Sequence, residues 1–232
     1  MMTQRQLAVI GAIGAFAFGL ASTTLFSAER FDHQVRNKFF AGFNGDLAAL
    51  DEAMKQCEAV LAENPKHSEA RVWYGSGQMT KASRLMGTDR EKGIQLYMTG
   101  LKNMDQAVAE EPKSVGVRVP RAAVLQAVAR FTPKEQTADL LRRVLEDYEF
   151  VLDIQKPEWD KVGSHPKGEL LFGLADAYSR TGDTEKATMF FDRISTEMPG
   201  TPYAKRAAMW KETKVPLPVA QTRCIGCHTP GN

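Results

Sequence analysis

Evenly spaced prolines constrain the fold of this chain more than any other feature of its sequence. Four of them stand roughly 42 to 47 residues apart: Pro65, Pro112, Pro157 and Pro199. From Phe31 onward, the apolar residues between these prolines recur at helical spacing. Because proline cannot continue an α-helix, each one predicts the end of a helical unit. Regular units of this size indicate internal repeats, so we expect about four helix pairs and a last partial helix at residues 201–212.

The clearest unit covers residues 168–199, where two apolar stripes flank a Thr-Gly-Asp turn. The stripes are Leu171, Leu174, Ala175 and Tyr178, then Ala187, Phe191 and Ile194. These residues resemble the tetratricopeptide repeat, in which the second helix nests closely against the first. The resemblance implies an all-α fold of antiparallel helix pairs, stacked as a right-handed solenoid. It also implies a concave face of the kind that commonly binds other proteins, and it implies no catalysis.

Two earlier stretches carry apolar and small residues at positions that match those of this unit. Residues 37–65 carry Phe40, Ala41, Ala53, Cys57 and Val60, and residues 93–112 carry Gly100, Met104 and Ala107. These units are longer than the family's usual period, which implies extended helices or loops near residues 85–92 and 130–136. We therefore expect a repeat domain over residues 29–212. Within this domain, Cys57 lies on a predicted amphipathic helix, and we expect it to serve as a small, buried apolar residue.

The first 28 residues form a separate segment, because no charged residue occurs between Arg5 and Glu29. Leu7 to Phe26 is long enough and apolar enough to cross a bilayer as a helix. Gly11, Ala15 and Gly19 recur at the four-residue spacing of packed membrane helices, although small residues are also common in such segments. The segment is either a membrane anchor or a cleaved signal peptide. Both interpretations place residues 29–232 on the periplasmic side of a bacterial inner membrane.

The last 20 residues differ in character from the repeats. Pro216 and Pro218 oppose a helix and favour an extended strap over residues 213–232, which ends in Cys-Ile-Gly-Cys-His. This sequence resembles the attachment motif of c-type cytochromes. The resemblance implies one covalent haem c, held through thioethers at Cys224 and Cys227, with His228 as an axial iron ligand. Haem is attached in this way outside the bacterial inner membrane, which agrees with the N-terminal export segment.

Three other interpretations of the tail remain. A zinc ion would need a fourth ligand beyond the two cysteines and the histidine. A Cys-x-x-Cys oxidoreductase normally has a thioredoxin-like sheet, which a helical chain lacks. A plain disulfide between Cys224 and Cys227 is the third. The small cytochromes, with an axial methionine after the motif, are excluded because only four residues follow His228. Cytochromes of the c′ type differ because their motif lies on the last bundle helix.

A sixth iron ligand would have to come from upstream residues or from a partner. His165 is the first candidate, because we expect it in the loop of residues 161–169, just before the last full repeat, from which the strap leaves. Met198 and Met209 follow, since they are close in sequence to the tail. His33 and His67 are further candidates, each at an expected helix start where exposed histidine is common. An iron with no sixth ligand would be open to small ligands.

Several other side chains have two interpretations each. Arg118 and Arg121 flank Pro120 and are either anion or haem-propionate ligands or a solvated or inter-helix salt-bridged pair. The aromatic residues belong either to the core or to a binding groove: Trp73, Tyr74, Trp159 and Trp210. Basic residues precede the motif, with Glu212 among them, and either pair with haem propionates, steer an acidic redox partner or form a solvated cap: Lys205, Arg206, Lys211, Lys214 and Arg223.

The leading functional hypothesis is an electron-transfer cytochrome subunit that docks to a periplasmic or membrane redox complex through its repeats. One alternative is a scaffold or assembly protein with structural haem or none. A second alternative is a haem enzyme or sensor with an open iron. No catalytic residue is indicated, so a carrier or binding subunit is expected rather than an enzyme. The formal net charge of +2 and the mixed charge pattern exclude a typical nucleic-acid protein.

Overall fold

The structure is a computed structural model that describes residues 30–218, and all regular structure in this range is helical. The α-helices are α1 (Phe31–Phe43), α2 (Leu47–Glu63), α3 (Ser68–Leu85), α4 (Arg90–Glu110), α5 (Val115–Phe131), α6 (Ala138–Gln155), α7 (Ser164–Thr181), α8 (Thr184–Glu197) and α9 (Pro202–Thr213). Two short 3-10 helices are η1 (Lys134–Gln136) and η2 (Lys156–Lys161).

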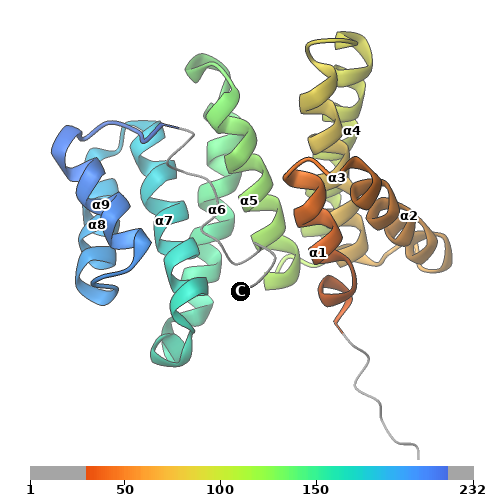
Figure 1. Ribbon diagram of the computed structural model, residues 1–232. Coiled ribbons are helices and arrows are strands. Elements are labelled where there is room, and N and C mark those ends of the chain that lie inside the picture. The colour runs from red at the N-terminus through yellow and green to blue at the C-terminus, as the bar shows by residue number, and fades with distance from the viewer. Residues whose placement is uncertain (1–29, 219–232) are drawn as a thin grey trace, which may run out of the picture.

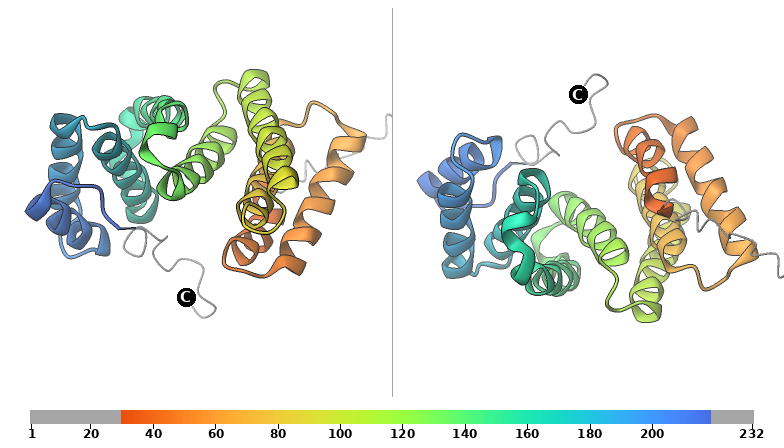
Figure 2. Two further views of the ribbon diagram at one scale, coloured as in Figure 1. Left: turned by 90° about the horizontal axis from the view of Figure 1, so that it is seen from above. Right: turned by 90° about the horizontal axis from the view of Figure 1, so that it is seen from below.

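The helices pack as consecutive pairs joined by short turns, so the two helices of a pair run antiparallel (Figure 1). The pairs are α1–α2, α3–α4, α5–α6 and α7–α8, and α9 packs on α8. The first helix of each pair also contacts the first helix of the next, as α3 contacts α5 and α5 contacts α7. Figure 2 shows the pairs following one another in chain order from one end of the molecule to the other. The expected four pairs and final helix are confirmed.

Side-chain caps begin several of the helices, as their sequences favour. Asp46 precedes α2 and accepts a hydrogen bond from the backbone N–H of Ala49 at 3.0 Å. Asp183 caps α8 in the same way, through the backbone N–H of Lys186 at 3.0 Å. These bonds satisfy N–H groups that have no partner within the helix. Gly182 ends α7 with a left-handed φ of 88°, a conformation that glycine adopts without strain. The Thr-Gly-Asp turn therefore closes the α7–α8 pair as its sequence predicts.

The core runs between the layers of helices and contains the predicted apolar stripes. Leu171, Leu174 and Ala175 on α7 are fully buried, as are Ala187 and Ile194 on α8. The longer repeat period arises mainly from α3 and α4, which contain 18 and 21 residues, and from the insertion of η1 after α5. Pro157 behaves differently from the other prolines, since it lies within η2 directly after α6.

The predicted N-terminal segment, residues 1–28, lies outside the described residues. Within residues 30–218, none of the helices is both long enough and apolar enough to cross a membrane.

Candidate functional site

The predicted attachment residues Cys224, Cys227 and His228 lie outside the described residues, but the beginning of their strap is described. Leu217 is 6% exposed and packs against the core. Arg180, near the end of α7, donates a hydrogen bond from Nη2 to the carbonyl oxygen of Leu217 at 3.0 Å. The strap therefore leaves the repeats next to the C-terminal end of α7.

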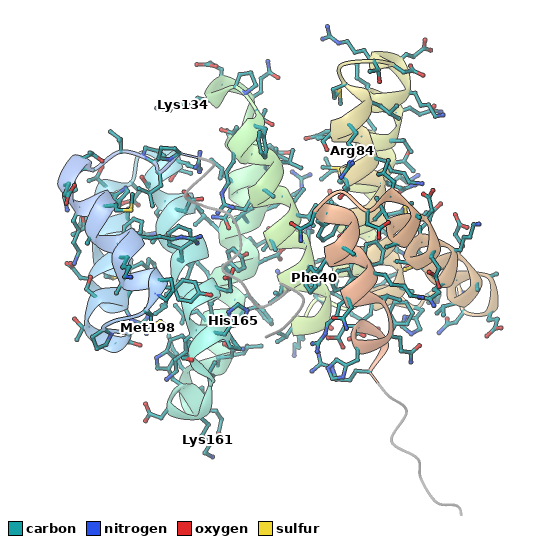
Figure 3. The ribbon with its side chains drawn as sticks, viewed as in Figure 1. Phe40, Arg84, Lys134, Lys161, His165 and Met198 are labelled. Carbon is teal, nitrogen blue, oxygen red and sulfur yellow. The ribbon has the colours of Figure 1, made fainter. Side chains whose placement is uncertain are left out.

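His165 lies in the first turn of α7, and not in the loop that its sequence context predicts. Its Nδ1 is 2.9 Å from the hydroxyl oxygen of Tyr203 on α9. The same hydroxyl lies 2.6 Å from Oε1 of Glu169, one turn further along α7. Figure 3 shows His165 between Lys134, at the upper end of this part of the molecule, and Lys161 at its lower end. Gly168 allows Tyr203 to approach α7 this closely, because a Cβ at Gly168 would lie 2.3 Å from the Tyr203 ring.

The hydrogen bonds around Tyr203 determine the tautomer of His165. The phenol has one proton, and the short contact to a carboxylate oxygen directs it toward Glu169. The Tyr203 oxygen then accepts a hydrogen bond from Nδ1–H of His165. A neutral histidine protonated at Nδ1 carries its lone pair on Nε2. Histidines that bind metals are commonly oriented in this way, by a hydrogen bond from the other ring nitrogen.

The other two histidine candidates have different surroundings. Nδ1 of His67 accepts the backbone N–H of Ala70 at 3.1 Å and caps α3. His67 therefore carries its proton on Nε2 when neutral, and that nitrogen has no free lone pair. His33 is exposed on α1, with Nε2 at 3.9 Å from Oδ2 of Asp32. Both positions agree with the prediction of histidines at helix starts, and neither has the orientation of His165.

The two methionine candidates differ in exposure. Met198 follows α8 and is 4% exposed, so its thioether belongs to the core. Met209 on α9 is 37% exposed. His165 is therefore the candidate, among those in the described part of the chain, whose ring is held by a hydrogen bond in the tautomer that iron ligation needs.

Arg118 and Arg121 form buried ion pairs, as the salt-bridge interpretation predicts. Both contact Asp147 of α6, which is fully buried: Arg118 Nη1 lies 2.6 Å from Oδ1, and Arg121 Nε lies 2.7 Å from Oδ2. Arg121 Nη1 also lies 2.8 Å from Oδ1 of Asp105 on α4, a residue shared with Arg143 of α6. Burial alone would lower the pKa of Arg121, but the hydrogen bond and charge of Asp147 outweigh it and raise that pKa.

The sequence interpretation missed Asp147 as the centre of this network. Its acidic side chain lies at a position of α6 that the helical period assigns to the core, between Val144 and Val151. A charged residue at such a position needs an opposite charge nearby, and that rule would have paired it with the arginines of the preceding helix.

The remaining residues mostly have structural roles. Trp73 and Trp210 are core residues, with 6% and 0% exposure. Trp159 is half-buried in η2, and its Nε1–H donates to Oε2 of Glu197 at 2.8 Å. Tyr74 is half-buried and donates its hydroxyl proton to Glu58 at 2.8 Å. Cys57 is fully buried, as expected.

The basic residues of α9 and the first strap residues largely have local contacts. Lys211 Nζ lies 2.6 Å from Oδ1 of Asp192. The cation of Arg206 lies 5.1 Å from the ring centre of Phe172, and that of Lys214 lies 4.6 Å from the ring centre of Trp210. Lys205 is exposed, and Arg223 lies beyond the described range.

Within residues 30–218, no group of three or more His, Cys, Asp or Glu side chains is arranged to hold a metal ion. Comparisons with protein-family models, with curated proteins and with solved structures find no match to this chain.

Proposed function

We propose that this protein is a monohaem c-type cytochrome that transfers electrons on the periplasmic side of a bacterial inner membrane. In this proposal its tetratricopeptide-like helix pairs dock to a redox partner or membrane complex, and its C-terminal strap carries the haem. Cys224 and Cys227 would attach the haem, and His228 would bind its iron. A haem bound in this way supplies one-electron redox chemistry and requires no catalytic side chain.

The observation that carries the proposal is the orientation of His165. Its Nδ1 is engaged by Tyr203, so the lone pair of Nε2 is available to a metal. Tyr203 is in turn engaged by Glu169, which fixes the direction of the hydrogen bond. A second histidine ligand would give a six-coordinate iron, the arrangement suited to electron transfer rather than to ligand binding.

The length of the strap is sufficient for His228 to meet His165. Arg180 and His165 lie fifteen residues apart on α7, which corresponds to about 22 Å along a helix. Leu217 is held beside Arg180, and the eleven residues from there to His228 can extend over about 36 to 40 Å. The chain therefore has the reach to bring both histidines to one iron, with some length left for a turn.

A visible spectrum of the purified full chain tests the proposal directly. We expect a sharp reduced α-band, haem that resists acid–acetone extraction, and no change when carbon monoxide is added to the reduced protein. Replacing His165 by alanine should produce a high-spin, carbon-monoxide-binding iron. His33→Ala is the matched control, because His33 is exposed on a different helix and its loss should leave the spectrum unchanged.

Other results would favour the alternative functions. Haem that is absent or fully extractable would contradict the cytochrome proposal and favour a scaffold or assembly protein. A wild-type spectrum that shifts with carbon monoxide would favour a haem enzyme or sensor with an open iron. A low-spin spectrum that survives His165→Ala would show that His165 is not the second iron ligand. The remaining candidates would then be Met209, Met198, His33 and His67.

A further inference from the structure

The outward face of α5 is apolar, while the charged residues of this helix point into the protein. Arg118, Arg121 and Gln126 are 7%, 4% and 3% exposed. On the opposite face, Val119 is 37% exposed and Phe131 is 76% exposed. This distribution is the reverse of that in an ordinary surface helix.

Helix geometry places the exposed residues on one stripe. Residues facing α6 include Arg118 and Arg121, both paired with Asp147. Positions two residues further on are rotated by about 200°, so they face away from α6. The exposed members of this stripe are Val119, Ala123, Ala127 and Phe131, flanked by half-buried Pro120, Val124 and Val128. In Figure 1, α5 lies in front of α6. An uncharged stripe over more than three helical turns indicates a surface that binds another molecule or segment.

We propose that this stripe on α5 is covered by the C-terminal segment of the same chain, residues 219–232. This inference rests on the proposed function only for the presence of haem. It deepens that function because it gives the Cys224–His228 motif a place on the repeats. Three features favour this occupant: the point where the strap begins, the length and composition of the segment, and the alignment of α5 with α7.

Side-chain contacts connect the beginning of the strap to α5 in three steps. Arg130 of α5 lies 2.9 Å from Oδ2 of Asp176 on α7. Asp176 also accepts from Nε of Arg180 at 3.0 Å. Arg180 holds the carbonyl oxygen of Leu217. The strap therefore leaves the core beside the C-terminal half of α5, close to where the stripe ends at Phe131.

The segment has the length and composition to follow the stripe. From Val119 to Phe131 the stripe spans about 18 Å at the rise of an α-helix. Fourteen extended residues can span about 46 to 50 Å, which is more than twice that length. Residues 219–232 contain one Lys, Arg, Asp or Glu side chain, Arg223, so little charge would have to be desolvated on an apolar surface.

The alignment of α5 with α7 connects this surface to His165. Gln126 Nε2 donates to the carbonyl oxygen of Gly173 at 2.9 Å, and Arg130 contacts Asp176. From the first contact to the second, the residue numbers increase on both helices, as they do in a parallel pair. Seven residues before this point, Val119 is level with the first turn of α7, which contains His165. A segment that enters near Phe131 and follows the stripe toward Val119 would thus approach His165.

A photo-cross-link tests this proposal in the full chain. A benzoylphenylalanine probe placed at Ala127, an exposed position, should cross-link to peptides from residues 219–232 of the same molecule. The matched control places the probe at Met189 on α8, which is 49% exposed and outside the stripe, and should give no such product. If the probe at Ala127 prevents folding, Ala123 offers a second exposed position on the same stripe.

Three outcomes would overturn the docking proposal: no tail cross-link from either stripe position, an equal yield from Met189, or cross-links to a second copy of the chain. The measurement is repeated with Cys224→Ser and Cys227→Ser together, which prevents thioether formation. Tail cross-links combined with absent haem would retain the docking and contradict the cytochrome function. Covalent haem without tail cross-links would retain the cytochrome function and contradict the docking.

Discussion

Gly75 on α3 and Gly100 on α4 lie where the two helix backbones meet. A Cβ on Gly75 would be 2.8 Å from the carbonyl oxygen of Gly100, and a Cβ on Gly100 would be 2.9 Å from that of Gly75. Contacts this short with backbone atoms cannot be relieved by moving a side chain. The two glycines therefore set the close packing of the longest helix pair in the described part of the chain.

Gly100→Ala should destabilise the protein despite the better helix propensity of alanine. Alanine favours the helix by about 1 kcal/mol, while overpacking typically costs about 1 to 3 kcal/mol, and here the contact is with backbone. A lower midpoint of urea unfolding is the expected result. Gly87→Ala is the control, because a Cβ at Gly87 meets nothing within 4 Å. Equal midpoints for wild type and Gly100→Ala would contradict the assigned close approach.

Asp147→Ala should be far more damaging than the loss of an exposed acid on the same helix. Its removal leaves Arg118 and Arg121 buried without their shared carboxylate, which typically costs about 3 to 5 kcal/mol. Asp139→Ala, at an exposed position of α6, should change the free energy of unfolding by about 1 kcal/mol or less. Chemical denaturation of the three proteins gives the comparison, and similar losses for both variants would disprove the prediction.

The thiol of Cys57 should be unreactive in the folded protein across the neutral and mildly alkaline range. Burial raises its pKa from 9.0 to about 12, helped by the nearby charge of Glu58. Because the pKa of this thiol is higher in the folded than in the unfolded state, the folded state keeps its full stability below pH 9. The free energy of unfolding then falls as the pH rises toward 12. Labelling with a thiol reagent at pH 7 to 9.5 should give no product from Cys57 before unfolding.

Thiol labelling also tests whether Cys224 and Cys227 carry haem. The chain has three cysteines, so a denatured and reduced sample should yield one thiol if Cys224 and Cys227 are thioethers. Three thiols would instead fit a reducible disulfide or a zinc site.

If the proposed cytochrome function is correct, Tyr203→Phe should weaken the binding of His165 to the iron without detaching the haem. The hydroxyl that orients His165 would be lost, while the ring that packs against Gly168 remains. Removing such a supporting hydrogen bond typically lowers metal affinity about 10- to 100-fold. Added imidazole should therefore displace the ligand at a correspondingly lower concentration, as measured from the visible spectrum. Tyr74→Phe, which loses its bond to Glu58, is the control and should behave as wild type.

The fold could be predicted largely from local sequence signals, because each helix pair is made by contacts close in sequence. The Thr-Gly-Asp turn, the buried position of Cys57 and the final helix all follow from such signals. The His165–Tyr203 contact does not, since it joins residues 38 positions apart on α7 and α9. The prediction that His165 lies in a loop was wrong, because α7 begins at Ser164, directly after Gly163, and therefore includes the histidine.

The apolar face of α5 was also beyond sequence analysis. Its arginines stand at the spacing of an ordinary exposed face, and only Asp147 on another helix shows that they point inward. A helical period identifies two faces of α5 but does not say which one meets α6.

Asp105 has a consequence for how the protein could be shortened. It belongs to the α3–α4 pair, yet its carboxylate contacts Arg121 and Arg143 of the α5–α6 pair. A fragment beginning at α5 would keep both guanidinium groups and lose this counter-charge, although the cut falls between two pairs. Arrays of this kind are often treated as modules that can be removed or exchanged one at a time. At this junction the pairs share a carboxylate, so the natural unit of truncation contains α3 to α6 together.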